Sequence, residues 1–129
     1  MKLSQLGGRF AIARLPAGSR IPDWALGSPL FSAIVQTPEE LSVVAPDVAV
    51  PERVQAERGW ACLRVDGRLD FSETGVLASI AEPLAGAGIS IFAVSTYDTD
   101  YILVAERELA AAHRALTTAG HVVNLSETS

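Results

Sequence analysis

The order of apolar and polar stretches in the C-terminal half of the chain restricts its fold more than any other feature of the sequence. Residues 60–65 are short, apolar and bounded by glycine-containing turns, which is typical of a strand. Apolar residues then recur at helical spacing over residues 75–87, and a second helical stripe covers residues 106–119. Further strand-like stretches lie at residues 89–96, 101–105 and 121–125. The predicted order is therefore strand, helix, strand, strand, helix, strand.

This order is that of a ferredoxin-like unit, a four-stranded antiparallel sheet with two helices on one face. The first half of the chain shows the same order more faintly, with only short helical turns between predicted strands at residues 9–15, 31–37 and 41–45. We therefore predict an α+β fold made of two ferredoxin-like βαββαβ modules with antiparallel sheets. The N-terminal module, residues 1–58, is abbreviated, and the C-terminal module covers residues 59–129.

Pro83 lies inside the first predicted helix of the C-terminal module. Its ring nitrogen carries no hydrogen, so it cannot donate to the carbonyl group of Ser79 one turn earlier. The sequence therefore predicts a kink or a local break at this point.

The charge of the chain disfavours nucleic acid and anionic membranes as partners. The formal net charge is -5, and residues 59–129 hold nine acidic side chains against four basic ones. Affinity for nucleic acid comes mostly from lysine and arginine side chains that neutralise phosphates. The sequence also contains no apolar run of membrane-spanning length and no signal-like apolar segment near its start. We expect a soluble, cytoplasmic protein.

Candidate catalytic and metal-binding residues are few. Cys62 is the only cysteine and lies in an apolar strand, where a free cysteine usually behaves as a small hydrophobic residue. His113 and His121 have no acidic residue at metal-ligand spacing, so we expect both to be structural. We predict no catalytic residue, no metal site and no cofactor.

The loop before the first helix, "DFSETG" at residues 70–75, holds more polar groups than the start of one helix needs. Asp70 or Thr74 is the expected N-cap. The free amide groups and the dipole at the helix start attract a carboxylate, and Gly75 allows a ligand to approach the backbone closely. Asp70 or Glu73 can then hold an ammonium group. The loop is therefore a candidate site for both charged ends of a free amino acid.

A purely structural interpretation of these residues also stands. Asp70 and Glu73 can form a pair like that of a capping box, and residues 95–98 can form an ordinary hairpin turn. In the ligand-binding interpretation, Asp100 near the hairpin tip selects the distal end of a polar or basic side chain.

The stretch "DFSETGVLASIAEPLAGA" followed by "GISIFAVSTYDTDYILV" resembles the ACT domain family, and within it the tandem group that includes the CASTOR arginine sensors. The resemblance implies regulation rather than catalysis, with an amino acid bound at an interface between modules and an output protein as a further partner. Because the chain has half the modules of a CASTOR sensor, the resemblance also implies that two copies form a homodimer through their C-terminal modules. The ligand contacts that the resemblance implies are Ser72, Glu73, Gly75, Val76, Thr96, Tyr97 and Asp100. The full set of predicted ligand-binding residues adds Asp70, Phe71 and Ser95.

Two other functions remain open at this stage. In the first, the chain is a ligand-free structural or interaction module, and "DFSETG" only starts a helix. In the second, the chain is a small enzyme that uses the same cleft.

Overall fold

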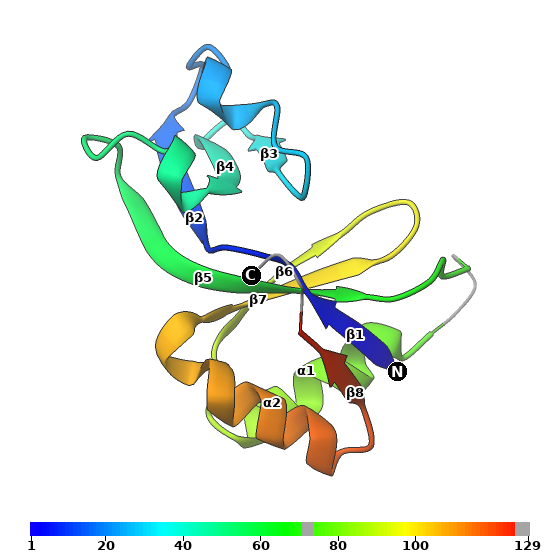
Figure 1. Cartoon of the computed structure of the whole chain (residues 1–129). Coiled ribbons are helices and arrows are strands. Elements are labelled where there is room, and N and C mark those ends of the chain that lie inside the picture. The colour runs from blue at the N-terminus through cyan, green and yellow to red at the C-terminus, as the bar shows by residue number, and fades with distance from the viewer. Residues whose placement is uncertain (71–73, 126–129) are drawn as a thin grey trace. The chain divides into compact units, whose positions relative to one another are not determined.

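The computed structural model describes residues 1–70 and 74–125, and the chain divides into two compact units (Figure 1). The larger unit comprises Met1–Gly7 and Ala61–Ser129, and the smaller unit comprises Gly8–Trp60. Strand β5 (Ala56–Val65) begins in the smaller unit and ends in the larger one. Each unit has its own cluster of buried apolar side chains.

The larger unit has the predicted ferredoxin-like organisation. Besides the second part of β5 it contains β1 (Lys2–Gln5), α1 (Val76–Gly86), β6 (Ile91–Ser95), β7 (Asp100–Ala105), a 3-10 turn at Glu106–Glu108, α2 (Leu109–Thr118) and β8 (Val122–Asn124). Its strands lie in the order β6-β7-β5-β1-β8, and both helices cover one face of the sheet (Figure 1). Without β1, this is the strand order of a βαββαβ module, so the predicted fold class is confirmed.

Strand β1 is the element that the sequence analysis missed. Leu3 pairs with Val65 of β5 in the antiparallel direction, and Lys2 pairs with Val122 of β8 in the parallel direction. The larger unit therefore has a fifth strand and one parallel pairing, where a four-stranded antiparallel sheet was predicted. Met1–Gly7 belong to this unit, whereas the predicted division at residue 58 assigned them to the N-terminal module. The physical reason is the burial of Leu3 in the core between this sheet and its helices.

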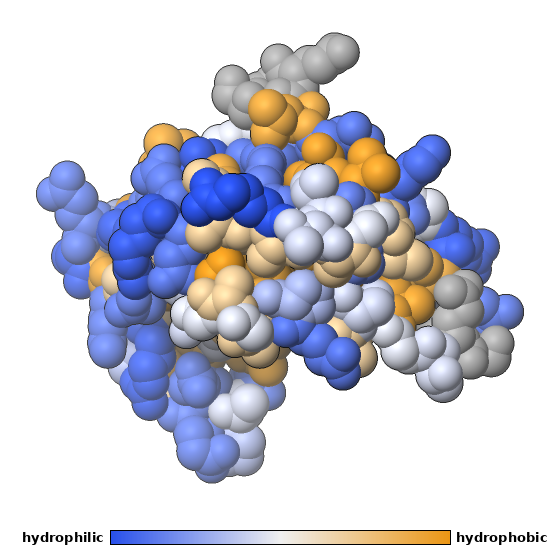
Figure 2. Space-filling model, turned by 90° about the horizontal axis from the view of Figure 1, so that it is seen from below, coloured by the Kyte–Doolittle hydropathy of each residue, from blue (hydrophilic) through white to orange (hydrophobic). Residues whose placement is uncertain are grey.

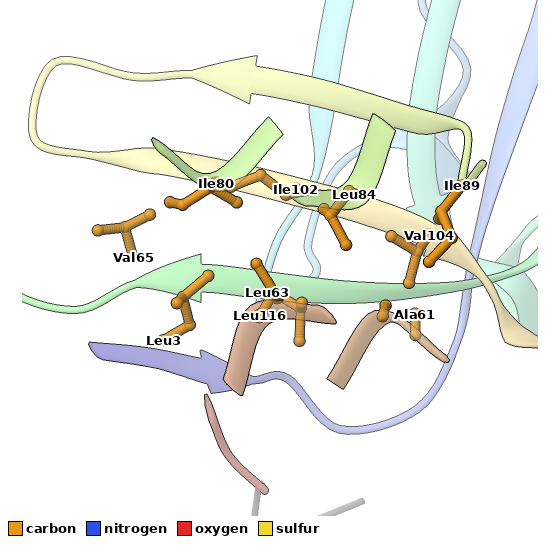
Figure 3. Close-up of a cluster of buried hydrophobic side chains, with 11 residues drawn as sticks. Leu3, Ala61, Leu63, Val65, Ile80, Leu84, Ile89, Ile102, Val104 and Leu116 are labelled. Atoms are coloured by element: carbon orange, nitrogen blue, oxygen red, sulfur yellow. The ribbon is translucent and has the colours of Figure 1, made fainter. Parts of the chain in front are cut away.

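The core of the larger unit lies between the sheet and the two helices (Figure 3). Ile80 and Leu84 from α1 and Leu116 from α2 pack in one cluster with Leu63 and Val104 from the sheet. All five side chains are fully buried. Burying one such aliphatic side chain contributes roughly 1.5–3 kcal/mol. This packing fixes α1 on the sheet and thereby fixes the position of its N-terminus.

Pro83 does not interrupt α1, which continues past it to Gly86. The Ser79 carbonyl group, which loses its helical donor, accepts a hydrogen bond from Nε2 of His121 at 2.8 Å. The His121 side chain is only 7% exposed. His121 therefore supplies a replacement donor, which is a structural role of the kind expected for it.

The smaller unit is an abbreviated version of the same module. It contains β2 (Phe10–Pro16), a 3-10 turn at Asp23–Ala25, β3 (Ala33–Gln36), β4 (Glu40–Pro46), a 3-10 turn at Asp47–Ala49 and the first part of β5. The strand order is β3-β4-β2-β5, which is again the ferredoxin-like order. Each helix of the module is reduced to one 3-10 turn, and each turn follows a proline, Pro22 or Pro46. The prediction of a shortened N-terminal module is confirmed.

Several small residues of α1 and α2 line a surface groove. Figure 2 shows neutral and weakly hydrophobic residues in the middle of the face seen from below. A shallow groove of about 540 Å³ is lined by Pro83, Gly86, Ala87, Ala111, Arg114, Ala115, Thr118 and Ala119. In the part of the chain that the structure describes, neither helix has the length and hydrophobicity needed to cross a membrane.

Candidate functional site

A pocket of about 320 Å³ lies in the larger unit where three segments of the chain meet. These segments are part of the loop after β5 (Leu69 and Asp70), the start of α1 (residues 75–78) and the tip of the β6–β7 hairpin (residues 95–100). A volume of this size is at the lower end of the range of small-molecule sites. The pocket is therefore large enough for a small metabolite such as a free amino acid.

The residues at the start of α1 line this pocket. Gly75 is the N-cap, with a φ of 78° that favours glycine, and the Ser79 amide donates to its carbonyl group at 2.9 Å. The amide groups of Val76, Leu77 and Ala78 have no acceptor among the described residues. Together with the helix dipole, such groups attract an anion.

No side chain caps α1 in the part of the chain that the structure describes. The N-cap is Gly75, so the prediction that Asp70 or Thr74 occupies this position is wrong. The left-handed backbone conformation at Gly75 turns the chain into the helix instead. As a result, no described side chain accepts a hydrogen bond from the first turn of α1.

The hairpin tip is a hydrogen-bonded turn that is anchored to the end of β5. The Thr96 amide donates to the Thr99 carbonyl group at 2.8 Å, and the Thr99 amide donates to Oγ1 of Thr96 at 3.2 Å. Oγ1 of Thr99, whose residue is 3% exposed, donates to the Val65 carbonyl group at 2.7 Å. The Thr96 hydroxyl thus has a role within the turn, and Thr99 joins the turn to the sheet.

Acidic side chains give the pocket a negative region. Asp70, Asp98 and Asp100 all line it. Oγ of Ser95 donates to Oδ1 of Asp100 at 2.5 Å across the hairpin, which holds the Asp100 carboxylate in place. Carboxylates in fixed positions suit a cationic group of a ligand.

The structure brings together every predicted ligand-binding residue that it describes. Lining the pocket are Asp70, Gly75, Val76, Ser95, Thr96, Tyr97 and Asp100. The predicted contacts Phe71, Ser72 and Glu73 lie outside the described residues.

Five residues that were not predicted from the sequence also line the pocket: Leu69, Leu77, Ala78, Asp98 and Thr99. Leu77 and Ala78 follow directly from the predicted helix start, because the first turn leaves several amide groups open. Asp98 lies in the hairpin turn, as the structural interpretation had it, and lines the pocket as well.

No group of histidine, cysteine, aspartate and glutamate side chains suited to a metal ion occurs among the described residues.

Cys62 is fully buried in β5, and burial raises the pKa of its thiol to about 12. Because the thiolate is the reactive form, we expect the folded protein at pH 8 to resist labelling by a thiol reagent such as DTNB. Denaturant should expose Cys62 and allow one thiol per chain to react. Fast labelling without denaturant would contradict the burial of this side chain.

His113 of α2 has a buried Nε2 atom with no hydrogen-bond partner among the described residues, and desolvation by burial lowers its pKa. The unfolded chain therefore binds a proton to His113 more readily than the folded chain does, so the folded state loses stability as the pH falls below about 6.5. We expect urea denaturation to show this loss between pH 7 and pH 5.5. The His113→Gln variant should have a flatter pH profile, and identical slopes for the two proteins would contradict the assignment.

Two family models match consecutive parts of the chain. A model of the ACT domain matches residues 55–118, and a model of an N-terminal domain matches residues 8–53. The mouse protein named cytosolic arginine sensor for mTORC1 subunit 1 is 43% identical over 51 residues, which are 39% of this chain and 15% of the sensor. The chain therefore corresponds to a small part of that sensor.

Two solved structures are similar to this chain over most of its length. Protein Atu0741 from Agrobacterium tumefaciens has a TM-score of 0.92 at 40% identity, over 98% of this chain and 93% of that one. The regulatory subunit of aspartate kinase from Thermus thermophilus has a TM-score of 0.61 at 14% identity, over 88% of this chain and 93% of that one, and shares the fold. The first family model shows that the chain contains an ACT domain at residues 55–118, and the ferredoxin-like strand order of the units agrees with it.

Proposed function

We propose that this protein is a regulatory module that binds a free amino acid in the pocket at the start of α1. One observation carries the proposal: Val76, Leu77 and Ala78, whose amide groups have no acceptor among the described residues, line the same pocket as Asp100. A free amino acid has both a carboxylate and an ammonium group. The helix start suits the first and the aspartates suit the second.

The remaining lining favours a ligand with a polar or cationic side chain. Leu69, Val76 and Leu77 offer apolar surface, and Asp100 adds an acidic group to the same lining. L-arginine is the first candidate to test, because the related mouse sensor is named for it.

We further propose that the protein forms a homodimer through its larger unit. Among the described residues, β6 pairs only with β7, so it is an edge strand. The surrounding stretch, residues 89–97, contains no charged residue and no proline, and such an edge readily pairs with another strand. Since Ser95 and Thr96 line the pocket, a second copy joined along β6 would lie beside the ligand.

In this proposal the role is regulatory, and no chemical step takes place. A ligand that binds one arrangement of the modules more tightly than another shifts the population toward the first. The shift can be no larger than the difference in affinity between the two arrangements. The amount of an output protein bound to one arrangement would then depend on the ligand concentration.

The proposal is tested by thermal unfolding in the presence of each of the twenty amino acids, beginning with L-arginine. A ligand at a hundred times its Kd adds about 2.7 kcal/mol to the stability of the folded state, which raises the Tm by several degrees. We expect such a shift with at least one amino acid. If none of the twenty raises the Tm, the chain is not an amino-acid-binding module, and a bound compound that is recovered chemically altered would indicate an enzyme instead.

A further inference from the structure

We propose that Arg68 is a positioning residue for the pocket. It holds the loop after β5 against the tip of the β6–β7 hairpin, and these are two of the three segments that line the pocket. The part of this inference that concerns ligand affinity rests on the function proposed above. The contact between the two segments is observed in the structure and does not depend on that function.

The guanidinium group of Arg68 contacts two consecutive residues of the hairpin tip. Its Nε lies 3.2 Å from Oδ1 of Asp98, and its Cζ lies 5.5 Å from the centre of the Tyr97 ring. The first contact is an ion pair, and the second has the geometry of a cation–π interaction. One side chain therefore fixes both residues at the tip.

The backbone next to Arg68 makes a further contact with the same tip residue. The Leu69 amide donates to the Asp98 carbonyl group at 2.6 Å. The ion pair with Arg68 holds the side chain of Asp98, and the hydrogen bond from Leu69 holds its main chain. We call this set of contacts, made by Arg68, Leu69, Tyr97 and Asp98, the clasp.

Arg68 acts on the pocket through its neighbours. It is absent from the lining of the 320 Å³ pocket, whereas Leu69, Tyr97 and Asp98 belong to that lining. Arg68 instead lines a second hollow of about 370 Å³ together with Leu69, Asp70 and Tyr97. The guanidinium group thus lies behind residues that can touch a ligand, which is the place of a positioning residue.

The clasp is exposed to solvent, which limits its strength. The side chains of Arg68 and Asp98 are 71% and 60% exposed, so water and salt screen the ion pair. Loss of the clasp should change affinity by about threefold to tenfold, which is the scale of exposed ion pairs and cation–π contacts.

The first test needs no ligand and compares the variants Arg68→Gln and Arg114→Gln with the unchanged chain. Arg114 is an exposed arginine of α2 that does not line the pocket and makes none of the clasp contacts, so its variant removes the same charge and leaves the clasp intact. We expect hydrogen exchange of the Leu69 amide, followed by NMR, to accelerate about threefold to tenfold in Arg68→Gln only. Equal exchange in all three proteins would overturn the clasp.

The second test measures the Kd of the amino acid that gives the largest thermal shift, with L-arginine as the first probe. We expect weaker binding by about threefold to tenfold in Arg68→Gln, with a shallower dependence on salt. Arg68→Lys should recover part of the affinity, because lysine keeps the charge but lacks the planar group that lies over Tyr97.

The two tests separate this inference from the proposed function. If the unchanged chain binds none of the twenty amino acids, the proposed function fails, and exchange at Leu69 still decides whether the clasp exists. If the unchanged chain binds an amino acid and Arg68→Gln binds it equally well, the positioning role of Arg68 is overturned.

Discussion

Replacing Thr99 with valine is expected to lower the free energy of unfolding by about 1–3 kcal/mol, since it deletes the donor of a buried hydrogen bond and leaves the shape of the side chain nearly unchanged. Oγ1 of Thr99 donates to the Val65 carbonyl group at 2.7 Å, and the residue is 3% exposed. The bond joins the hairpin tip to the end of β5. Urea denaturation of Thr99→Val measures the effect.

The matched control for this change is Thr99→Ser, which keeps the hydroxyl group and loses only a methyl group. We expect it to be clearly more stable than Thr99→Val. If valine at this position is as stable as serine, the hydroxyl group contributes nothing to the fold, and the anchoring of the hairpin tip must come from other contacts.

Replacing Asp100 with asparagine is expected to weaken amino acid binding about tenfold or more, because a hydrogen bond to a charged partner contributes more than one between neutral groups. Asparagine can still accept the hydrogen bond from Oγ of Ser95. The Tm of the ligand-free protein should therefore change little, while the ligand-induced shift largely disappears. Thermal unfolding with and without the amino acid measures both quantities.

Asp66→Asn provides a control with the same chemistry at another place. Oδ2 of Asp66 accepts a hydrogen bond from Oγ of Ser4 at 3.0 Å, and Asp66 is absent from the pocket lining. This variant should keep the full ligand-induced shift. Equal loss of the shift in both variants would point to a general effect of charge rather than to a site at Asp100.

The fold of the larger unit was predictable where apolar residues recur over a long stretch. The two helices and the strand pairs around them follow from periodicity, because each buries one continuous face. Strand β1 was not predictable in this way. It is four residues long, and Leu3 is its one large apolar residue. The stretch "KLSQ" therefore shows no alternation that would predict a strand. It becomes a strand only through its pairing with Val65 and Val122.

The candidate site was predictable at the level of segments and less so at the level of individual roles. The glycine at residue 75 and the turn-forming residues at 95–100 predict a helix start and a hairpin, and the resemblance to the ACT domain family implied that both contact one ligand. The separate roles of Thr96 and Thr99 depend on which hydroxyl group reaches which carbonyl group, and the sequence "TYDT" is equally compatible with other turns. The same holds for Arg68, whose contact with Asp98 joins residues that are far apart in the chain.

The central claim, that a free amino acid binds between the start of α1 and the hairpin tip, is tested most directly by the amide resonances of the ligand-free protein during titration with each amino acid. The expected result is a saturable change for at least one of them, largest at Val76, Leu77 and Ala78 and next largest at residues 95–100. The amide chemical shifts of residues that line the groove formed by α1 and α2, such as Ala111 and Ala115, should not change. Saturable changes confined to that groove, or no change with any amino acid, would contradict the claim.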